Sequence, residues 1–217
     1  MSLVTCILFF NGYSMKKWIL SAFLLLFASA ASFANNAVAE QIKKNAPQKV
    51  TCQFEQQKFL KGMAKPVVSS GKLYYQNGNM AMWYTQPAGD FLIINPSQFV
   101  MQTRGKKREL NIKAGSAFLT LKNTLVMCMQ GNIQGIATEN GATLTYANNG
   151  GHEFTLTKEL KKGERGYAKI VLLYDAKTYL ITSMTLVEAN GNYTVYTMKD
   201  ANTTANIDGN LFKVPAK

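Results

Sequence analysis

The stretch Val67–Thr103, VVSSGKLYYQNGNMAMWYTQPAGDFLIINPSQFVMQT, decides the fold of this chain. Short apolar runs alternate in it with turn signals. Asn77-Gly78 is typical of a two-residue hairpin turn, and Pro87 and Pro96 mark two further turns. The runs are rich in aromatic, β-branched and methionine residues, which suit a pleated, half-buried surface. The pattern predicts four antiparallel strands in a meander whose apolar face is concave and covers another part of the protein or a ligand.

More strands are expected on both sides of this meander, because valine, isoleucine, threonine and tyrosine fill short runs between turns. These runs are Val50–Leu60, Glu109–Ile112, Ala142–Ala147, His152–Lys158, Tyr167–Tyr174, Tyr179–Glu188 and Asn192–Lys199. With a last edge segment at Leu211–Val214, the expected total is about ten or eleven strands. No period of fixed length repeats, which argues against a solenoid.

Two helices are expected among the strands. Asn36–Lys49 places apolar residues on one helical face, and Pro47 ends that helix. Ala114–Gly131 is apolar apart from Lys122 and carries more apolar surface than one buried stripe needs. Two roles are open for the second helix: an ordinary core helix, or a lid at about residues 115–131. Its methionines suit a lid, since methionine repacks around different guests.

The first 34 residues have the composition of a signal peptide. A positive Met15-Lys16-Lys17 precedes the apolar run Trp18–Phe27, and small residues follow as far as Ala34. The expectation is cleavage near Ala34, with Met15 as a possible true start, leaving residues 35–217 as one exported, soluble and unlipidated domain.

The chain is basic, with 24 Lys and Arg against 12 Asp and Glu and a net charge of +12. Such a surface suits nucleic acid, anionic lipid or an acidic partner, and export argues against nucleic acid. Four cations in Arg104–Arg108 predict a basic turn, either a solvated loop or a contact for an anionic group. Cys52 and Cys128 remain after cleavage, and both a disulfide and buried free thiols are open to them.

No set of residues in the sequence predicts catalysis. His152 is the single histidine, and no partners for it are evident. A His/Cys cluster of the zinc-binding kind and a glycine-rich phosphate motif are both missing from the sequence, and the acidic residues are scattered. The chain is therefore expected to act by binding, with no catalytic residues, metal or cofactor.

Five short motifs, in order and spacing, resemble the LolA family of periplasmic lipoprotein carriers. They are Phe54-x-Gln56-x-Lys58, Ser70-Gly71-Lys72-Leu73, Trp83-Tyr84-x-x-Pro87, Leu92-Ile93 and Leu211-Phe212-x-x-Pro215. The resemblance implies a mainly β (α+β) fold: an unclosed antiparallel β-barrel with an N-terminal helix and a lid helix over an apolar cavity. It also implies a periplasmic chaperone of a Gram-negative bacterium that carries lipoproteins from the inner to the outer membrane.

The implied partners are acylated lipoproteins, an inner-membrane lipoprotein-releasing ABC transporter and an outer-membrane receptor, with the carrier itself a monomer. Two alternatives stay open: an accessory protein that carries a different lipid, and a signalling protein of the same fold that senses lipoproteins.

In this family, an arginine followed by proline precedes an aromatic-x-Trp strand, and the arginine holds the lid closed. Aligned back from Trp83, the arginine position falls on Asn77 and the inward aromatic on Ala81, so the usual latch is missing. Counting alternate residues places Tyr75, Asn77, Ala81 and Trp83 on the cavity side and Met80 and Met82 on the other. The expected cavity walls are Tyr75, Trp83, Leu92, Ile94, Phe99 and Met101, and the expected inner face of the lid is Phe118, Leu121, Leu125 and Met129.

Overall fold

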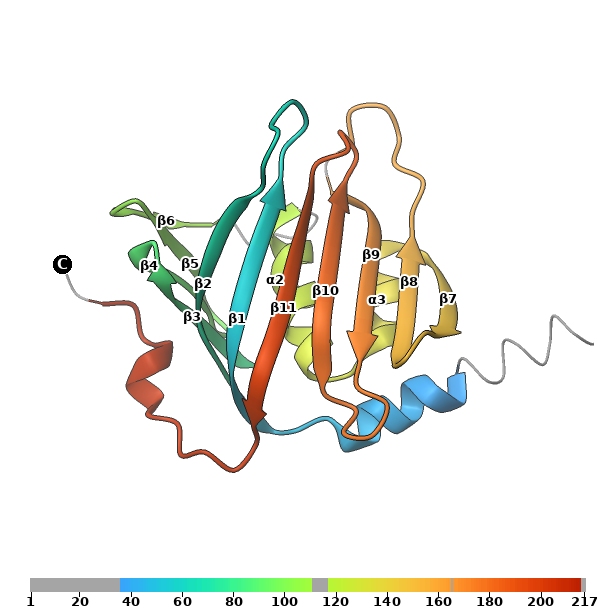
Figure 1. Ribbon diagram of the computed structural model, residues 1–217, viewed down its shortest axis with the longest axis horizontal. Coiled ribbons are helices and arrows are strands. Elements are labelled where there is room, and N and C mark those ends of the chain that lie inside the picture. The colour runs from blue at the N-terminus through green and yellow to red at the C-terminus, as the bar shows by residue number, and fades with distance from the viewer. Residues whose placement is uncertain (1–35, 111–116, 165, 216–217) are drawn as a thin grey trace, which may run out of the picture. The chain divides into compact units, whose positions relative to one another are not determined.

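A single antiparallel sheet of eleven strands is the centre of the computed structural model, which describes residues 36–110, 117–164 and 166–215 (Figure 1). The strands run in the order β6-β5-β4-β3-β2-β1-β11-β10-β9-β8-β7. Their bounds are β1 Lys49–Phe59, β2 Val67–Gln76, β3 Asn79–Gln86, β4 Ala88–Ile94, β5 Phe99–Thr103, β6 Lys106–Glu109, β7 Thr143–Asn148, β8 His152–Thr157, β9 Tyr167–Tyr174, β10 Ile181–Glu188 and β11 Tyr193–Asn202. The sheet does not close between β6 and β7, so the predicted unclosed antiparallel fold is confirmed.

The chain divides after Ala37 into two units, and the second, Val38–Lys217, holds the whole sheet. The signal peptide predicted for residues 1–34 lies outside the described residues. The second unit begins inside a helix that ends at Asn45, before Pro47 as predicted, and that buries Ala39 and Ile42. Across the described ranges, no helix has both the length and the apolar character that a membrane crossing requires.

Two helices, α2 (Ala117–Met129) and α3 (Ile133–Asn140), follow β6 and lie on the same face of the sheet (Figure 1). Gly131 ends α2 in a left-handed conformation, φ 61°. Its N–H bonds the Cys128 carbonyl, and the N–H of Asn132 bonds that of Met127. These two bonds form the cap that glycine allows at a helix end. The sequence analysis did not predict α3, although Asn132 caps it through a bond from Gly135 N–H.

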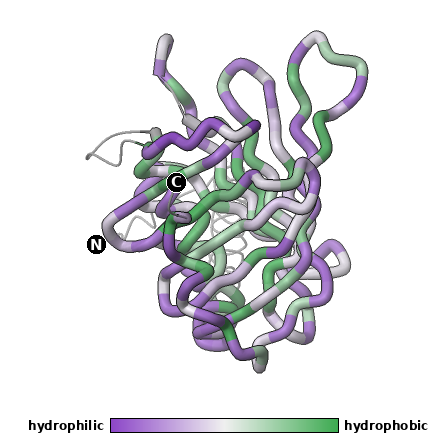
Figure 2. The backbone as a smooth tube through the Cα atoms, turned by 90° about the vertical axis from the view of Figure 1, so that its left-hand side faces the viewer, coloured by the Kyte–Doolittle hydropathy of each residue, from purple (hydrophilic) through white to green (hydrophobic). Residues whose placement is uncertain are grey.

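The two faces of the sheet are buried by different partners. On the face covered by α2 and α3, called here the helix-covered face, strands and helices share one large apolar core. On the opposite face the C-terminal segment covers a smaller core of Ala81, Phe91, Ile93, Val100, Ile207 and Phe212. Figure 2 shows hydrophobic and hydrophilic segments alternating along the chain, as a sheet with covered faces and exposed loops requires.

The basic run Arg104–Arg108 is mostly strand, so its prediction as a turn is wrong. The turn is confined to Arg104 and Gly105, both with positive φ, and β6 begins at Lys106. The buried carboxylate of Asp90 fixes that turn by accepting a 2.7 Å hydrogen bond from the backbone N–H of Arg104. Because the turn takes only two residues, the cations pair with β5 as an edge strand.

Candidate functional site: the helix-covered face

The β2–β3 hairpin decides which side chains face the helices. Across it, Tyr75 pairs with Met80 and Leu73 pairs with Met82, and paired residues of an antiparallel ladder share a face. All four side chains are buried in the core under α2 and α3. The prediction that Met80 and Met82 lie on the side opposite the cavity is therefore wrong.

Trp83 lies on the opposite face, so its predicted place in the cavity wall beside Tyr75 is wrong. The two-residue turn makes Gln76 the partner of Asn79, so odd-numbered residues of β2 share a face with even-numbered residues of β3. Counting alternate residues straight through the turn reverses this assignment. Ala81, predicted to face the cavity, is on the opposite face for the same reason.

Trp83 instead fixes the C-terminal segment to the sheet. Its indole Nε1–H donates a 3.1 Å hydrogen bond to the carbonyl oxygen of Leu211. Its ring lies 5.3 Å from that of Phe91, between centroids. The residue is thus structural in this fold, beneath the 3₁₀ helix Gly209–Phe212.

The other expected wall residues lie on the helix-covered face. Tyr75, Leu92, Ile94 and Phe99 are buried there. Met101 is half-buried and borders a groove near β6. Whether these five side chains contact a ligand stays a prediction.

Helix α2 is packed tightly at its C-terminal end and loosely at its N-terminal end. Leu125 and Met129 are 2% and 6% exposed, whereas Phe118 is 43% exposed. Leu121, one turn after Phe118, is half-buried. Of the four residues expected on the inner face of the lid, the two in its C-terminal half are therefore core residues, and burial decreases toward Phe118.

A pocket of about 430 Å³ opens at the loose end of α2. Phe118 and Leu121 line it from the helix, Tyr167 from β9, and Glu188 and Ala189 from the end of β10. Its mouth lies at the end of the sheet where β9 begins and β10 ends. The pocket lies between α2 and the sheet, and its lining is apolar on the helix side.

A buried hydrogen bond anchors the tight end of α2. The hydroxyl of Tyr174, itself fully buried, donates to the carbonyl oxygen of Cys128 at 3.0 Å. Gly131 lies against Ile42 of the N-terminal helix so closely that a Cβ there would meet Ile42 atoms 2.9 Å away. The fixed end of α2 therefore lies at Cys128–Gly131.

The space beneath the fixed end of α2 is almost full. A pocket lined by Cys52, Cys128, Met129 and Tyr174 has a volume of only about 10 Å³, roughly one water molecule. Methionine is abundant in the surrounding core, at Met80, Met82, Met129, Met184 and Met198. Unbranched thioether side chains refill gaps easily, so this core can change shape at low energetic cost.

One polar group of α2 is buried without a hydrogen-bond partner among the described residues. Thr124 of α2 is 1% exposed, and its hydroxyl has no hydrogen-bond partner among the described residues. A buried hydroxyl without a partner costs about 1–3 kcal/mol. Burying this hydroxyl therefore lowers the stability of the packed helix α2.

Cys52 and Cys128, the two cysteines among the described residues, are free thiols buried in the helix-covered core. Burial raises the pKa of the Cys52 thiol to about 12. It also raises the pKa of Cys128, whose Sγ lies 3.7 Å from Sδ of Met184. Thiols held in this neutral form are poor nucleophiles, so they act as apolar packing groups.

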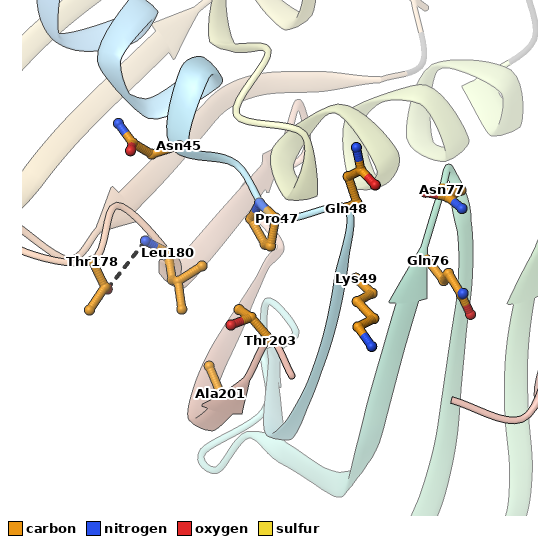
Figure 3. A pocket seen from close by; sticks show the side chains of 10 residues that line it. All are labelled: Asn45, Pro47, Gln48, Lys49, Gln76, Asn77, Thr178, Leu180, Ala201 and Thr203. Carbon is orange, nitrogen blue, oxygen red and sulfur yellow. Dashed lines mark hydrogen bonds between the residues drawn. The ribbon is translucent and has the colours of Figure 1, made fainter. Parts of the chain in front are cut away.

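Asn77, at the predicted latch position, lies at the tip of the β2–β3 hairpin (Figure 3). It has φ 47°, and its N–H donates a 2.9 Å bond to the carbonyl of Gln48. It borders a polar pocket of about 670 Å³ together with Asn45 and Thr203. Pro47, between the N-terminal helix and β1, lines this pocket and also the small pocket beside Cys128 and Gly131, which relates the position of Asn77 to the fixed end of α2. Its latch role stays a prediction.

The family match covers the sheet and the segments that pack on it. A model of the family described as outer membrane lipoprotein carrier protein LolA matches residues 45–215. The chain belongs to the LolA family. The matched LolA region begins at the end of the N-terminal helix and includes the sheet, α2, α3 and the C-terminal segment.

Solved structures similar to this chain are distant from it in sequence. A LolA superfamily protein of Nitrosomonas europaea is 9% identical, with 81% of this chain and 97% of that one covered and a TM-score of 0.40. The lipoprotein LppX of Mycobacterium tuberculosis is 12% identical, with 81% and 97% covered and a TM-score of 0.43. A chain of the MucA/MucB complex of Pseudomonas aeruginosa is 12% identical, with 81% and 59% covered and a TM-score of 0.38. No curated protein matches the sequence.

Several residues of the site were not identified from the sequence. Leu73 of β2, Tyr174 of β9, Met184 of β10 and Met198 of β11 all belong to the core that the sheet shares with α2 and α3. The alternation of apolar and polar residues within each strand indicates that the apolar residues of this set are buried. Their common face depends on pairing between β1 and β11, which no local pattern specifies.

Proposed function

We propose that this LolA-family protein binds acyl chains between α2 and the helix-covered face and carries acylated lipoproteins between membranes. The observation that carries the proposal is the gradient of packing along α2. One end is fixed by Tyr174 and Gly131, and the other leaves Phe118 exposed beside an open pocket. A helix held in this way can rotate away from the sheet at its N-terminal end.

The energetics favour such an opening when an acyl chain is present. Moving a CH₂ group out of water contributes roughly 0.8 kcal/mol. Several carbons are therefore enough to offset the apolar contacts that α2 loses. The methionines of the sheet can then repack around the guest, and the Thr124 hydroxyl gains access to water.

Delivery follows from the same geometry. The contacts of α2 with the core are mainly apolar and have no fixed direction, so the helix can close again once the chains leave. The proposal includes export by the segment 1–34 and a periplasmic domain 35–217. It also includes loading by an inner-membrane lipoprotein-releasing ABC transporter and delivery to an outer-membrane receptor.

Displacement of the uncharged fluorophore N-phenyl-1-naphthylamine tests the binding step. A synthetic lipopeptide should displace the probe, and the same peptide without acyl chains should not. Equal displacement by the two peptides would refute the proposal. Native mass spectrometry of protein from the periplasm then identifies the cargo: a lipoprotein supports the carrier function, and a different lipid supports the accessory alternative.

Phe118 provides the matched variant. Full burial of a phenylalanine is worth about 1.5–3 kcal/mol, so covering its 43% exposed part contributes about 1 kcal/mol. Phe118→Ala should weaken lipopeptide binding about fivefold. Met63→Ala is the control, because Met63, in the β1–β2 loop, is 55% exposed but does not line that pocket. Equal effects of the two variants would exclude the entrance at Phe118.

A further inference from the structure

A second opening on the helix-covered face, called here the basic groove, has a volume of about 530 Å³. Lys58 of β1 and Arg108 of β6 both line it, although four strands separate β1 from β6. In a flat sheet those two strands would be roughly 24 Å apart. The sheet therefore curls here and brings its first and sixth strands to one site.

The strand register directs the cations of β6 into this groove. Arg108 pairs with Met101 and Lys106 pairs with Thr103. Met101 and Thr103 lie on the same face as Phe99, which is buried in the helix-covered core. Lys106 and Arg108 thus face the inside of the curled sheet, and Lys107 between them donates instead to the carbonyl of Pro215.

The charges of the basic groove are unbalanced. Lys58, Arg104, Lys106 and Arg108 line it with a single carboxylate, Asp90. Asp90 is buried and already accepts the backbone N–H of Arg104. Within the described ranges, the ion pair at Lys158 and Glu164 is the only one, so none of the four cations is neutralised by a salt bridge there.

Protection of an exposed sheet edge does not account for this arrangement. Lysines on an edge strand do discourage pairing between molecules. Lys58, however, is on β1 in the middle of the sheet, and it lines the same groove as the edge cations. A shared, inward-facing cluster of positive charge is the arrangement expected of an anion site.

The basic groove is also joined to the apolar core. Tyr84 lines the groove and packs edge-on against Phe54 of the core, with ring centroids 5.0 Å apart. Val67 and Met101 add apolar surface to its wall. Burial, with smaller contributions from Tyr196 and Asp90, raises the pKa of Tyr84 well above its usual value. Its neutral hydroxyl donates to Gln56 at 2.8 Å.

We propose that the basic groove binds the phosphate of an anionic lipid whose acyl chains enter beneath α2. Arginine and lysine are the side chains suited to phosphate, and the volume lies within the range of ligand pockets. The inference rests on the proposed acyl-chain function and adds a headgroup preference to it. The ligand class is a glycerophospholipid, or another acylated molecule, with an unneutralised phosphate.

Calorimetric titration with two short-chain lipids tests the inference. Phosphatidylglycerol should bind at least about tenfold more tightly than diacylglycerol with the same chains. Lys106→Gln with Arg108→Gln should remove most of that preference and leave diacylglycerol binding unchanged. The control is Lys72→Gln with Lys199→Gln, which removes the same charge from exposed positions paired with Trp83 and Gln53, on the opposite face.

The outcomes separate this inference from the function on which it rests. Equal affinity for the two lipids, or equal effects of the two double variants, would overturn the headgroup site and leave acyl binding intact. Binding of neither lipid would overturn both. Inorganic phosphate serves as a third probe, and if it binds as tightly as phosphatidylglycerol, the site is one for free phosphate and the lipid assignment is wrong.

Discussion

Replacing Thr124 with valine should make the protein more stable and a weaker binder at the same time. The threonine is 1% exposed and its hydroxyl is unpaired among the described residues. Valine has nearly the same shape and a similar helix propensity, so the change mainly removes the cost of burying that hydroxyl. The expected gain in the free energy of unfolding is about 1 kcal/mol, at the low end of the range for such a group.

The same free energy should appear with opposite sign in ligand binding. If α2 must open to admit an acyl chain, the variant stabilises the closed state relative to the open one by about 1 kcal/mol. The affinity for an acylated peptide then falls about fivefold. For a domain of this length, the melting temperature should rise by about 3 °C.

Urea unfolding and displacement of the neutral probe measure the two effects on the same preparation. Thr138→Val is the matched control, because Thr138 is an exposed residue of α3 and should change neither quantity. A rise in stability with unchanged affinity would show that α2 does not open for ligand. Unchanged stability would show that the Thr124 hydroxyl is satisfied in solution.

Three further outcomes are expected. Trp83→Phe loses the bond to Leu211 and should lower the free energy of unfolding by about 1 kcal/mol in urea titrations without changing acyl-probe affinity; a loss of affinity would return Trp83 to the cavity. Leu125→Ala should cost about 3 kcal/mol by the same titration, since the residue is fully packed, and a cost below 1 kcal/mol would contradict that packing. Burial raises the pKa of Cys52 from 9.0 to about 12, so the unfolded state loses this proton first. Stability should therefore be full below pH 9 and fall as the pH rises toward 12, and Cys52→Ala should flatten that decline.

Local patterns in the sequence were sufficient for most of the strands and for α2. The turn at Asn77 and Gly78, the strands on either side and the helix that ends at Gly131 all agree with the structure. Each depends on contacts between residues only a few positions apart, as in a hairpin turn or a helix cap. The residue types at those positions indicate such local structures directly. The family motifs are of the same kind, and the family match over residues 45–215 agrees with them.

The face on which a side chain lies was harder to predict, because it depends on register across a turn. Trp83 shows this most clearly. A shift of one residue in the β2–β3 register moves its side chain from the helix-covered core to the face covered by the C-terminal segment. The helix α3 was missed because eight residues give little periodicity, although its caps at Asn132 and Gly141 are conventional.

The sequence by itself determined an exported-type leader pattern, a meander of short strands, one unusually apolar helix and an excess of positive charge. Only the tertiary structure decided which end of that helix is fixed, since Tyr174 and Ile42 reach it from distant parts of the chain. Only the curl of the sheet brought Lys58 and Arg108 into one groove. Both results depend on pairing between strands far apart in sequence. Such pairing is determined by the packing of the whole core, so no local stretch of sequence specifies it.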